Sequence, residues 1–318
     1  MAGWGVNVTP NTGPYVVAFL NRKGGVGKTS LAIALSEALV AAKKNVLVLD
    51  LDPQSSATQV MIPPNDLAKK LRTGLTLPDA LWLQMRDALK SENRGNYLSK
   101  MAHLVKDRSN INLSIIPNAD SLWDVEFDMR SADQVANLRA ATAAFLAPFF
   151  ADFDFVIVDC PPGRTITSDF IMERADLVLT PVTYDPLSIW GMEKMQDYFR
   201  KFHPDKPWYF IPNRLKGRLN DKEVDDVRKK YKAHLFTENA RRASALGGSA
   251  GEGLDKVFLE INEDKNIRLR MSRLHDDAFQ KKRRGDLKKL YGDQASKSLE
   301  DLARRVEDIV GKSPPRSW

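Results

Sequence analysis

The 318-residue chain is poor in cysteine and lacks long apolar runs. Cys160 is its only cysteine, which excludes an internal disulfide and any metal site built from several thiolates of one chain. No histidine lies near Cys160 in sequence, so we expect a small buried residue rather than a nucleophile. No apolar run approaches the roughly 18–20 residues that span a bilayer, and the N-terminus lacks the basic and apolar regions of a secretory signal. We therefore expect a cytoplasmic protein that does not cross a membrane.

The positive charge of the chain is concentrated in its C-terminal third. The net charge is +7, with 48 Lys and Arg against 41 Asp and Glu. Residues 1–212 have a balance of −1, whereas residues 213–318 have a balance of +8. A localised basic excess suits a polyanion such as nucleic acid, although helices of mixed charge can give the same count.

Short apolar runs rich in β-branched residues alternate with helical stretches. Continuous apolar runs are typical of strands covered on both faces, and the strand-helix order predicts right-handed crossovers between parallel strands. The expected fold class is therefore α/β, with a three-layer, mostly parallel twisted sheet flanked by helices. Strands are expected at residues 15–20, 46–50, 112–117, 155–159, 177–181 and 208–212, with a seventh candidate at 256–261.

The expected organisation is one domain over residues 15–312, with a flexible leader at 1–14 and a tail at 313–318. Residues 63–110 are long for one crossover, so we expect a helical insertion there, with helical candidates around 77–89 and 97–105. The basic C-terminal part begins near residue 213.

Two features lie within that basic part. A glycine-rich loop is expected at residues 245–253. A helix beginning near Ser296 places Leu299, Leu302 and Val306 on one face and mixed charges on the other. This pattern favours a terminal helix packed back on the domain, because a helix lying on a membrane has a more uniformly basic polar face.

The first expected strand leads into a glycine turn and a helix starting near Lys28. Glycines let the backbone approach phosphate oxygens, and a helix N-terminus adds a partial positive charge. We expect Lys28 to contact the β and γ oxygens of ATP and the Thr29 hydroxyl to bind Mg²⁺. The predicted nucleotide-binding residues are Gly24, Gly25, Val26, Gly27, Lys28, Thr29 and Ser30.

A second lysine, Lys23, stands directly before the glycine pair. The run from Lys23 to Thr29, Lys-Gly-Gly-Val-Gly-Lys-Thr, resembles the deviant Walker A box of the ParA/MinD family of ATPases. In that family the early lysine reaches across a dimer interface to the phosphates held by the partner subunit. The resemblance implies a P-loop NTPase fold of the deviant Walker A type. It also implies an ATP-dependent sandwich homodimer in which Lys23 and Lys28 are catalytic.

Acidic residues at two strand ends extend the resemblance. The segment Asp50-Leu-Asp-Pro-Gln matches the Asp-x-Asp-Pro-Gln element of the ParA branch. We expect Asp52 to orient the attacking water and Asp50 to support the water shell of Mg²⁺. Asp159 ends an apolar strand, as in a Walker B motif, and is expected to hold the Mg²⁺ hydration shell. Residues 161–164 would then form the loop that senses the γ-phosphate.

Two further segments are similar to the family. Residues 179–191 resemble its strand-Pro-Val segment and the helix that follows. Asn213 ends a strand in the run Ile-Pro-Asn-Arg, and the resemblance implies that its side chain binds the adenine. The similarity extends over about residues 15–310, with interruptions at 63–110 and around 215–255.

In the ParA branch the ATP-bound dimer binds DNA without sequence preference, and a cargo-bound partner stimulates slow hydrolysis and release. The resemblance implies a switch that segregates or positions a plasmid, a chromosome or a large protein assembly. It would use a ParB-like adaptor and associate with the nucleoid when ATP is bound. Such phosphate contacts need charge rather than a base-reading motif. The candidate DNA contacts are Arg268, Arg270, Arg273, Lys281, Lys282, Arg283 and Arg284.

Two other functions stay open at this point. A MinD-like membrane-associated ATPase is disfavoured by the Pro-Gln after Asp52 and by the mixed charge of the terminal helix. A metabolic ATP-dependent enzyme of the same fold is the second alternative. Its electron-transfer version uses a cluster bridged by two cysteines from each chain, which Cys160 alone cannot provide.

Overall fold

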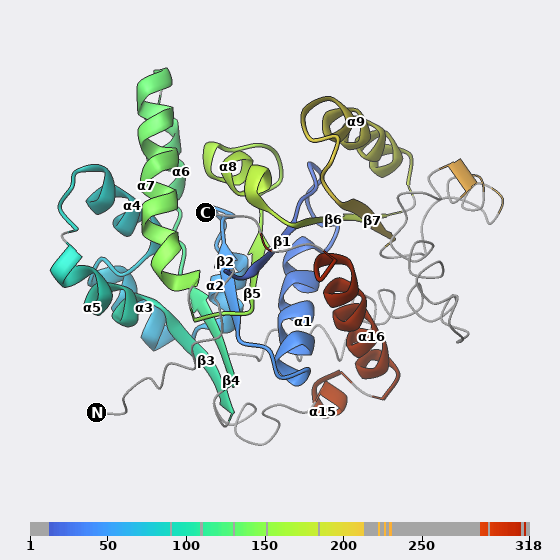
Figure 1. Ribbon diagram of the computed structural model, residues 1–318, viewed down its shortest axis with the longest axis horizontal. Coiled ribbons are helices and arrows are strands. Elements are labelled where there is room, and N and C mark those ends of the chain that lie inside the picture. Colours follow the sequence, from blue (N-terminus) through green and yellow to red (C-terminus); the bar gives the residue numbers. More distant parts are fainter. Residues whose placement is uncertain are drawn as a thin grey trace.

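The computed structural model describes residues 13–89, 91–108, 111–129, 131–150, 152–183, 185–212, 287–291 and 293–312, with residues 222, 226, 229, 230 and 315. The described part is built on a seven-stranded sheet in the order β3-β4-β2-β5-β1-β6-β7 (Figure 1). Every neighbouring pair is parallel except β3 and β4. The strands are β1 (Tyr15–Phe19), β2 (Val46–Asp50), β3 (His103–Arg108), β4 (Ile111–Ile116), β5 (Phe155–Asp159), β6 (Leu177–Val182) and β7 (Trp208–Pro212).

Helices cover both faces of this sheet, as the apolar runs predict (Figure 1). Alternate residues of β1 face opposite layers, since Val17 belongs to one buried core and Val16 to the other. The first core contains residues of α1 (Lys28–Ala41), α2 (Ser56–Met61), α15 (Leu287–Tyr291) and α16 (Asp293–Val310). The second contains residues of α4 (Leu77–Met85), α5 (Ser91–Met101), α6 (Leu122–Phe127), α7 (Ala132–Phe150), α8 (Ile166–Arg174) and α9 (Pro186–Phe202). The three-layer α/β fold is confirmed.

The register of the central strands brings their carboxyl ends together. β5 lies between β1 and β2, and Asp159 at its end is aligned with Phe19 on one side and Asp50 on the other. The turn that follows β1 and the acidic ends of β2 and β5 therefore share one edge of the sheet. This edge holds the site predicted from the sequence.

The terminal helix packs back on the domain, as expected. α16 begins at Asp293, three residues before the predicted start, and buries Leu299, Leu302 and Val306 in the core that it shares with α1. An ion pair of 3.0 Å between Lys44 and Glu307 lies at the edge of this contact. Within the described residues no helix combines the length and the apolar composition that a bilayer crossing requires.

The segment 63–110 is partly different from the prediction. It contains α3 (Pro64–Arg72), α4 and α5, but the helical candidate at 97–105 is wrong in its second half. The helix ends at Met101, and the chain then forms β3, antiparallel to the edge strand β4. Pairing with β4 satisfies the backbone of β3, and this tertiary contact leaves no periodic signal in so short a run.

Several predictions lie outside the described residues. They are most of the leader, the glycine-rich loop at 245–253, the strand candidate at 256–261, Asn213 and all seven candidate DNA contacts.

Candidate functional site

The glycine turn after β1 has the geometry of a phosphate-binding loop. Gly25 and Gly27 have φ angles of 73° and 96°, which side chains rarely tolerate. A Cβ atom built on Gly24 or Gly25 would meet nothing within 4 Å, so this part of the turn faces open space. α1 begins at Lys28, as predicted, and its N-cap residue Gly27 provides no side-chain hydrogen bond. The first N–H groups of α1 are therefore available to an anion.

Lys28 is held inside the turn rather than in solvent. Only 6% of Lys28 is exposed, and its ammonium lies 3.5 Å from the carbonyl oxygen of Lys23. Burial lowers the pKa of Lys28, while the nearby carboxylates of Asp159 and Asp52 oppose this change. A buried cation beside a helix N-terminus and two acids is suited to a phosphate ligand that brings further negative charge.

Asp159, at the end of β5, is a buried carboxylate whose two oxygens have no hydrogen-bond partner of ordinary geometry. Burial, followed by repulsion from Asp50, raises its pKa well above the usual value, against the opposing effects of Thr29 and Lys28. A buried acid of this kind needs a cation or a water shell to balance it.

The residues present therefore fit Mg²⁺ bound together with a nucleotide. Among the described residues no group of three His, Cys, Asp or Glu side chains is gathered to hold a metal directly. Mg²⁺ usually keeps several waters and binds one or two protein groups plus substrate phosphates. The Thr29 hydroxyl at the start of α1 and the Asp159 carboxylate would fill those protein positions.

Asp50 is also buried, but its oxygens are already engaged. They accept hydrogen bonds from the backbone N of Thr58 at 2.8 Å, the hydroxyl of Thr58 at 2.9 Å and the backbone N of Asp52 at 3.1 Å. Burial raises the pKa of Asp50 to about 6, although these bonds favour the charged form. Through these hydrogen bonds Asp50 fixes the backbone of the loop that contains Asp52. That Asp50 also supports the waters of Mg²⁺ stays a prediction.

Asp52 lines an open cavity of about 610 Å³. Its carbonyl oxygen accepts a hydrogen bond of 2.9 Å from Asn118, and its carboxylate accepts one of 3.0 Å from the backbone N of Gln54. The other walls of the cavity come from α6, the residues before it and the loop 161–165. The Asp52 carboxylate is therefore fixed at its backbone and open to solvent, as the orientation of a water requires.

Lys23 is bound within its own chain. Its ammonium donates to both carboxylate oxygens of Asp185, at 2.8 and 2.7 Å, and to the hydroxyl of Ser188 at 3.0 Å. Asp185 is also the N-cap of α9 and accepts from the backbone N of Ser188 at 3.1 Å. Burial acts to raise the pKa of Asp185. The hydrogen bonds from Lys23, Thr183 and Ser188 outweigh it and hold the pKa well below the usual range.

Asp185 is not among the site residues predicted from the sequence. The run Asp-Pro-Leu-Ser carries an N-cap signal, because an acid precedes a proline at the first helical position and a serine follows three residues later. That signal predicts the start of α9. It contains nothing that connects Asp185 with a lysine 162 residues earlier.

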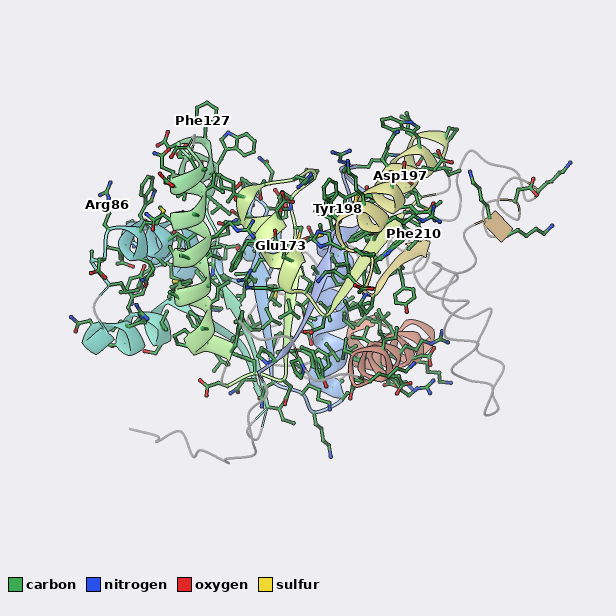
Figure 2. All side chains as sticks on the ribbon, turned by 45° about the horizontal axis from the view of Figure 1, so that its top comes forward. Arg86, Phe127, Glu173, Asp197, Tyr198 and Phe210 are labelled. Carbon is green, nitrogen blue, oxygen red and sulfur yellow. The ribbon has the colours of Figure 1, made fainter. Side chains whose placement is uncertain are left out.

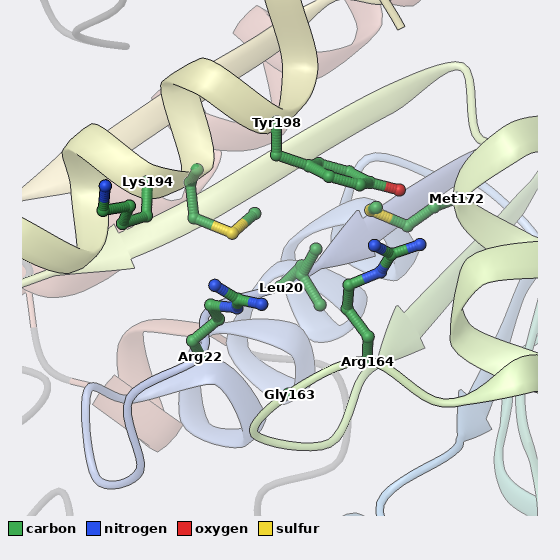
Figure 3. A pocket seen from close by; sticks show the side chains of 8 residues that line it. Leu20, Arg22, Gly163, Arg164, Met172, Lys194 and Tyr198 are labelled. Carbon is green, nitrogen blue, oxygen red and sulfur yellow. The ribbon is translucent and has the colours of Figure 1, made fainter. Parts of the chain in front are cut away.

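Arg164, at the end of the loop predicted to sense the γ-phosphate, is directed toward α8 and α9. Its guanidinium forms an ion pair of 2.7 Å with Asp169 and lies 4.7 Å from the ring centroid of Tyr198 (Figure 3). A small cavity of about 60 Å³ adjoins this contact. Cys160, which begins the same loop, is fully buried, and burial raises the pKa of its thiol. The expectation of a buried, unreactive cysteine agrees with this environment.

A family model described as an AAA domain, AAA_31, matches residues 15–207. The chromosome partitioning protein ParA of Myxococcus xanthus is 27% identical over 255 residues, which are 77% of this chain and 82% of that protein. A protein of Pseudomonas putida and the chromosome partitioning protein ParA of Caulobacter vibrioides are 27% and 29% identical to this chain. The matches cover 58% and 57% of this chain, and 62% and 60% of those proteins.

Two solved structures share the fold. The Cyanothece McdA variant in complex with ATP has a TM-score of 0.57 at 18% identity and covers 94% of this chain and 96% of that chain. A putative plasmid partition protein from Borrelia burgdorferi bound to AMPPNP has a TM-score of 0.51 at 20% identity, with coverages of 69% and 83%.

Proposed function

This chain belongs to the ParA/MinD-type AAA_31 family of P-loop ATPases, and on that premise we propose that it is an ATP-dependent dimerising switch. In this proposal the dimer binds DNA without sequence preference and segregates or positions a cargo. The observation that carries the nucleotide chemistry is the buried, unsatisfied carboxylate of Asp159 beside the N-terminus of α1. Partition and positioning are supported by the named relatives, among them ParA of Myxococcus xanthus.

The phosphate loop binds and orients the substrate. The N–H groups of residues 24–30 and the Lys28 ammonium surround the β and γ phosphates of ATP. Thr29 and Asp159 would hold Mg²⁺ and its waters, and the bound ion would supply positive charge beside the phosphate oxygens. Asn213, which follows β7 directly, is assigned to the adenine by family resemblance.

Hydrolysis depends on the placement of one water. Asp52 accepts a hydrogen bond from this water and directs its oxygen at the γ-phosphorus, in line with the bond to the bridging oxygen of ADP. The new oxygen–phosphorus bond forms as the bridging bond breaks, and ADP and inorganic phosphate result. Because Asp52 lies on an open cavity, we infer that turnover is slow until a partner closes the site.

The active form is a homodimer. Lys23 leaves Asp185 and contacts the phosphates held by the second copy, so that each site contains lysines from both subunits. Residues 15–312 form one ATPase domain with an insertion at 63–110. The basic part beyond residue 213 binds DNA, and a ParB-like adaptor that carries the cargo stimulates hydrolysis. The protein is cytoplasmic and associates with the nucleoid in its ATP-bound form.

The experiment that tests this function measures binding to random-sequence DNA with ATP, with ADP and without nucleotide. Reversing the charge of Lys282 and Arg283 should weaken ATP-dependent binding about tenfold or more and reduce its salt dependence. Reversing the charge of Lys69 and Arg72, which are exposed on α3 and outside the basic part, is the matched control. Unchanged retention of the double variant at moderate salt would remove this patch from the proposal. ATP-dependent sedimentation with anionic vesicles instead of DNA would favour the membrane-associated alternative.

A further inference from the structure

The edge of the sheet that holds the phosphate loop, Asp50 and Asp159 is called the nucleotide edge below. Large apolar side chains are exposed on both sides of it. Seven such side chains are strongly exposed among the described residues, and five of them lie on only two helices, α6 and α9; the fifth, Phe202, is at the far end of α9. The exposed fractions are 57% for Trp123 and 62% for Phe127 on α6, and 72% for Leu187 and 60% for Trp190 on α9. α6 follows β4 and α9 follows β6, and the order β4-β2-β5-β1-β6 places them on opposite sides of the strands that carry the site.

The surface on the α6 side is acidic, and we call it the acidic wing. It consists of Asp120, Trp123, Asp124 and Phe127, and the first three line the open cavity beside Asp52. Figure 2 shows Phe127 projecting outward, away from the sheet. Among the described residues that line this cavity, Arg164 is the one cation, and its guanidinium is bound to Asp169.

The surface on the α9 side is basic, and we call it the basic wing. It consists of Arg22, Leu187, Trp190 and Lys194. The Lys194 ammonium lies 5.7 Å from the ring centroid of Trp190, and Figure 3 shows Arg22 and Lys194 at the same small cavity.

Two ion pairs near the basic wing add no net charge to it, whereas Asp197, three residues after Lys194 on α9, is exposed. Lys23 is bound to Asp185, and Glu193, next to Lys194, forms an ion pair of 2.8 Å with Lys230. Arg22 and Lys194 are both exposed and outnumber Asp197, so this surface has a positive sign.

We propose that the acidic wing of one copy packs against the basic wing of a second copy, with Trp123 and Trp190 as the apolar anchors. The inference rests on the ATP-dependent homodimer proposed above and specifies its contact surface. In a two-fold dimer a contact between different wings occurs twice. The alternative arrangement, each wing against itself, would place Asp120 and Asp124 opposite the same acids of the second copy, which is unfavourable.

The composition of the two wings suits a reversible interface. Exposed tryptophans surrounded by charged residues are typical of the centre of a protein–protein contact. Opposite charges on the wings would accelerate association and select the orientation in which the two nucleotide edges face each other. Lys23, which is bound to Asp185 at the start of α9, is then next to the second copy.

The first test measures dimerisation of the full chain by sedimentation velocity with Mg²⁺ and AMPPNP. Trp123→Ala and Trp190→Ala should each raise the dimer dissociation constant at least tenfold, because each contact occurs twice. Phe202→Ala removes an aromatic residue that is 55% exposed at the far end of α9, and it should leave the constant unchanged. AMPPNP affinity, measured by calorimetry on dilute protein, should match the wild type in all three variants.

The second test separates this pairing of wings from any other. Asp124→Lys and Lys194→Glu should each weaken their own homodimers, because each places like charges in contact twice. An equimolar mixture of the two variants should dimerise again, since in the mixed dimer both contacts join opposite charges. Lys201→Glu, at the far end of α9, is the control and should neither weaken the dimer nor restore it in a mixture.

The outcomes are distinguishable from a failure of the proposed function. If wild-type protein binds AMPPNP but stays monomeric, the proposed dimer itself is wrong. If the wild type dimerises and both tryptophan variants dimerise equally well, the wings are not the interface. Loss of both homodimers without recovery in the mixture would overturn the pairing of acidic with basic wing. ATP-dependent vesicle binding that is lost with either tryptophan would assign these surfaces to a membrane instead.

Discussion

The Lys23 ammonium lies 2.7 Å from a carboxylate oxygen of Asp185. The lysine directly precedes the phosphate loop and the acid is the N-cap of α9, so one ion pair connects the nucleotide edge with the helix of the basic wing. The side chains are 35% and 21% exposed, which limits the stability that the pair contributes. Lys23 can therefore exchange Asp185 for another anion at small cost.

The stability of α9 should depend on Asp185 more as a helix cap than as an ion-pair partner. Asp185→Ala should lower the free energy of unfolding by about 1 kcal/mol, because the N-cap bond to Ser188 is lost. Asp185→Asn keeps a capping oxygen and removes the charge, and should lose about 0.5 kcal/mol or less. Urea unfolding measures both values. Equal losses in the two variants would show that the charge, and not the cap, stabilises this region.

Neutralising Asp159 should stabilise the folded protein and abolish the further stabilisation that Mg²⁺ with AMPPNP provides. Asp159→Asn removes a buried charge whose desolvation exceeds what Thr29 and Lys28 offset, and should raise the free energy of unfolding in metal-free buffer by on the order of 1–3 kcal/mol. The same variant should lose the increase in melting temperature that Mg²⁺ with AMPPNP gives the wild type. The exposed Asp152→Asn is the control for both measurements. A destabilised Asp159→Asn protein would contradict the assignment of an unbalanced carboxylate.

Asp50 should give the folding stability a distinct pH dependence. Burial raises its pKa to about 6 in the folded protein, against about 4 in an unfolded chain. The folded state therefore binds this proton more tightly, so wild-type stability falls as the pH rises from about 4 to 6 and the penalty persists above. Relative to the wild type, Asp50→Asn should gain on the order of 2–3 kcal/mol between pH 4 and 7. A difference that does not change with pH would mean that Asp50 titrates normally.

Removing the Asp52 carboxylate should separate nucleotide binding from hydrolysis. Asp52→Ala should bind ATP with near wild-type affinity, because the loop N–H groups and Lys28, and not the Asp52 carboxylate, contact the phosphates. Its dimer should then persist, with the release of phosphate reduced at least a hundredfold. Lys28→Ala is the contrasting variant and should lose ATP binding itself. Normal stimulated hydrolysis by Asp52→Ala would exclude this residue from the mechanism.

The nucleotide edge could be predicted because its signals are local. Gly25 and Gly27 are required by their own backbone angles, and the helix that follows begins at the residue after the last glycine. Continuous apolar runs ending in Asp50 and Asp159 identified β2 and β5, and parallel pairing then brings both acids to one edge. The amphipathic face of α16 likewise predicted a helix packed on the domain. In each case the information lies within a few consecutive residues.

The remaining features were decided by contacts between distant segments. β3 exists because β4 offers it an edge, and the Lys23–Asp185 pair joins residues 162 positions apart. The two carboxylates at the strand ends look alike in the sequence, yet Thr58 satisfies Asp50 while Asp159 stays unsatisfied. The exposure of Trp123 and Trp190 depends on how α6 and α9 lie on the sheet. Consecutive residues were therefore sufficient to predict the nucleotide edge. Burial and packing between distant segments determined which of its charges are balanced and which apolar side chains are exposed.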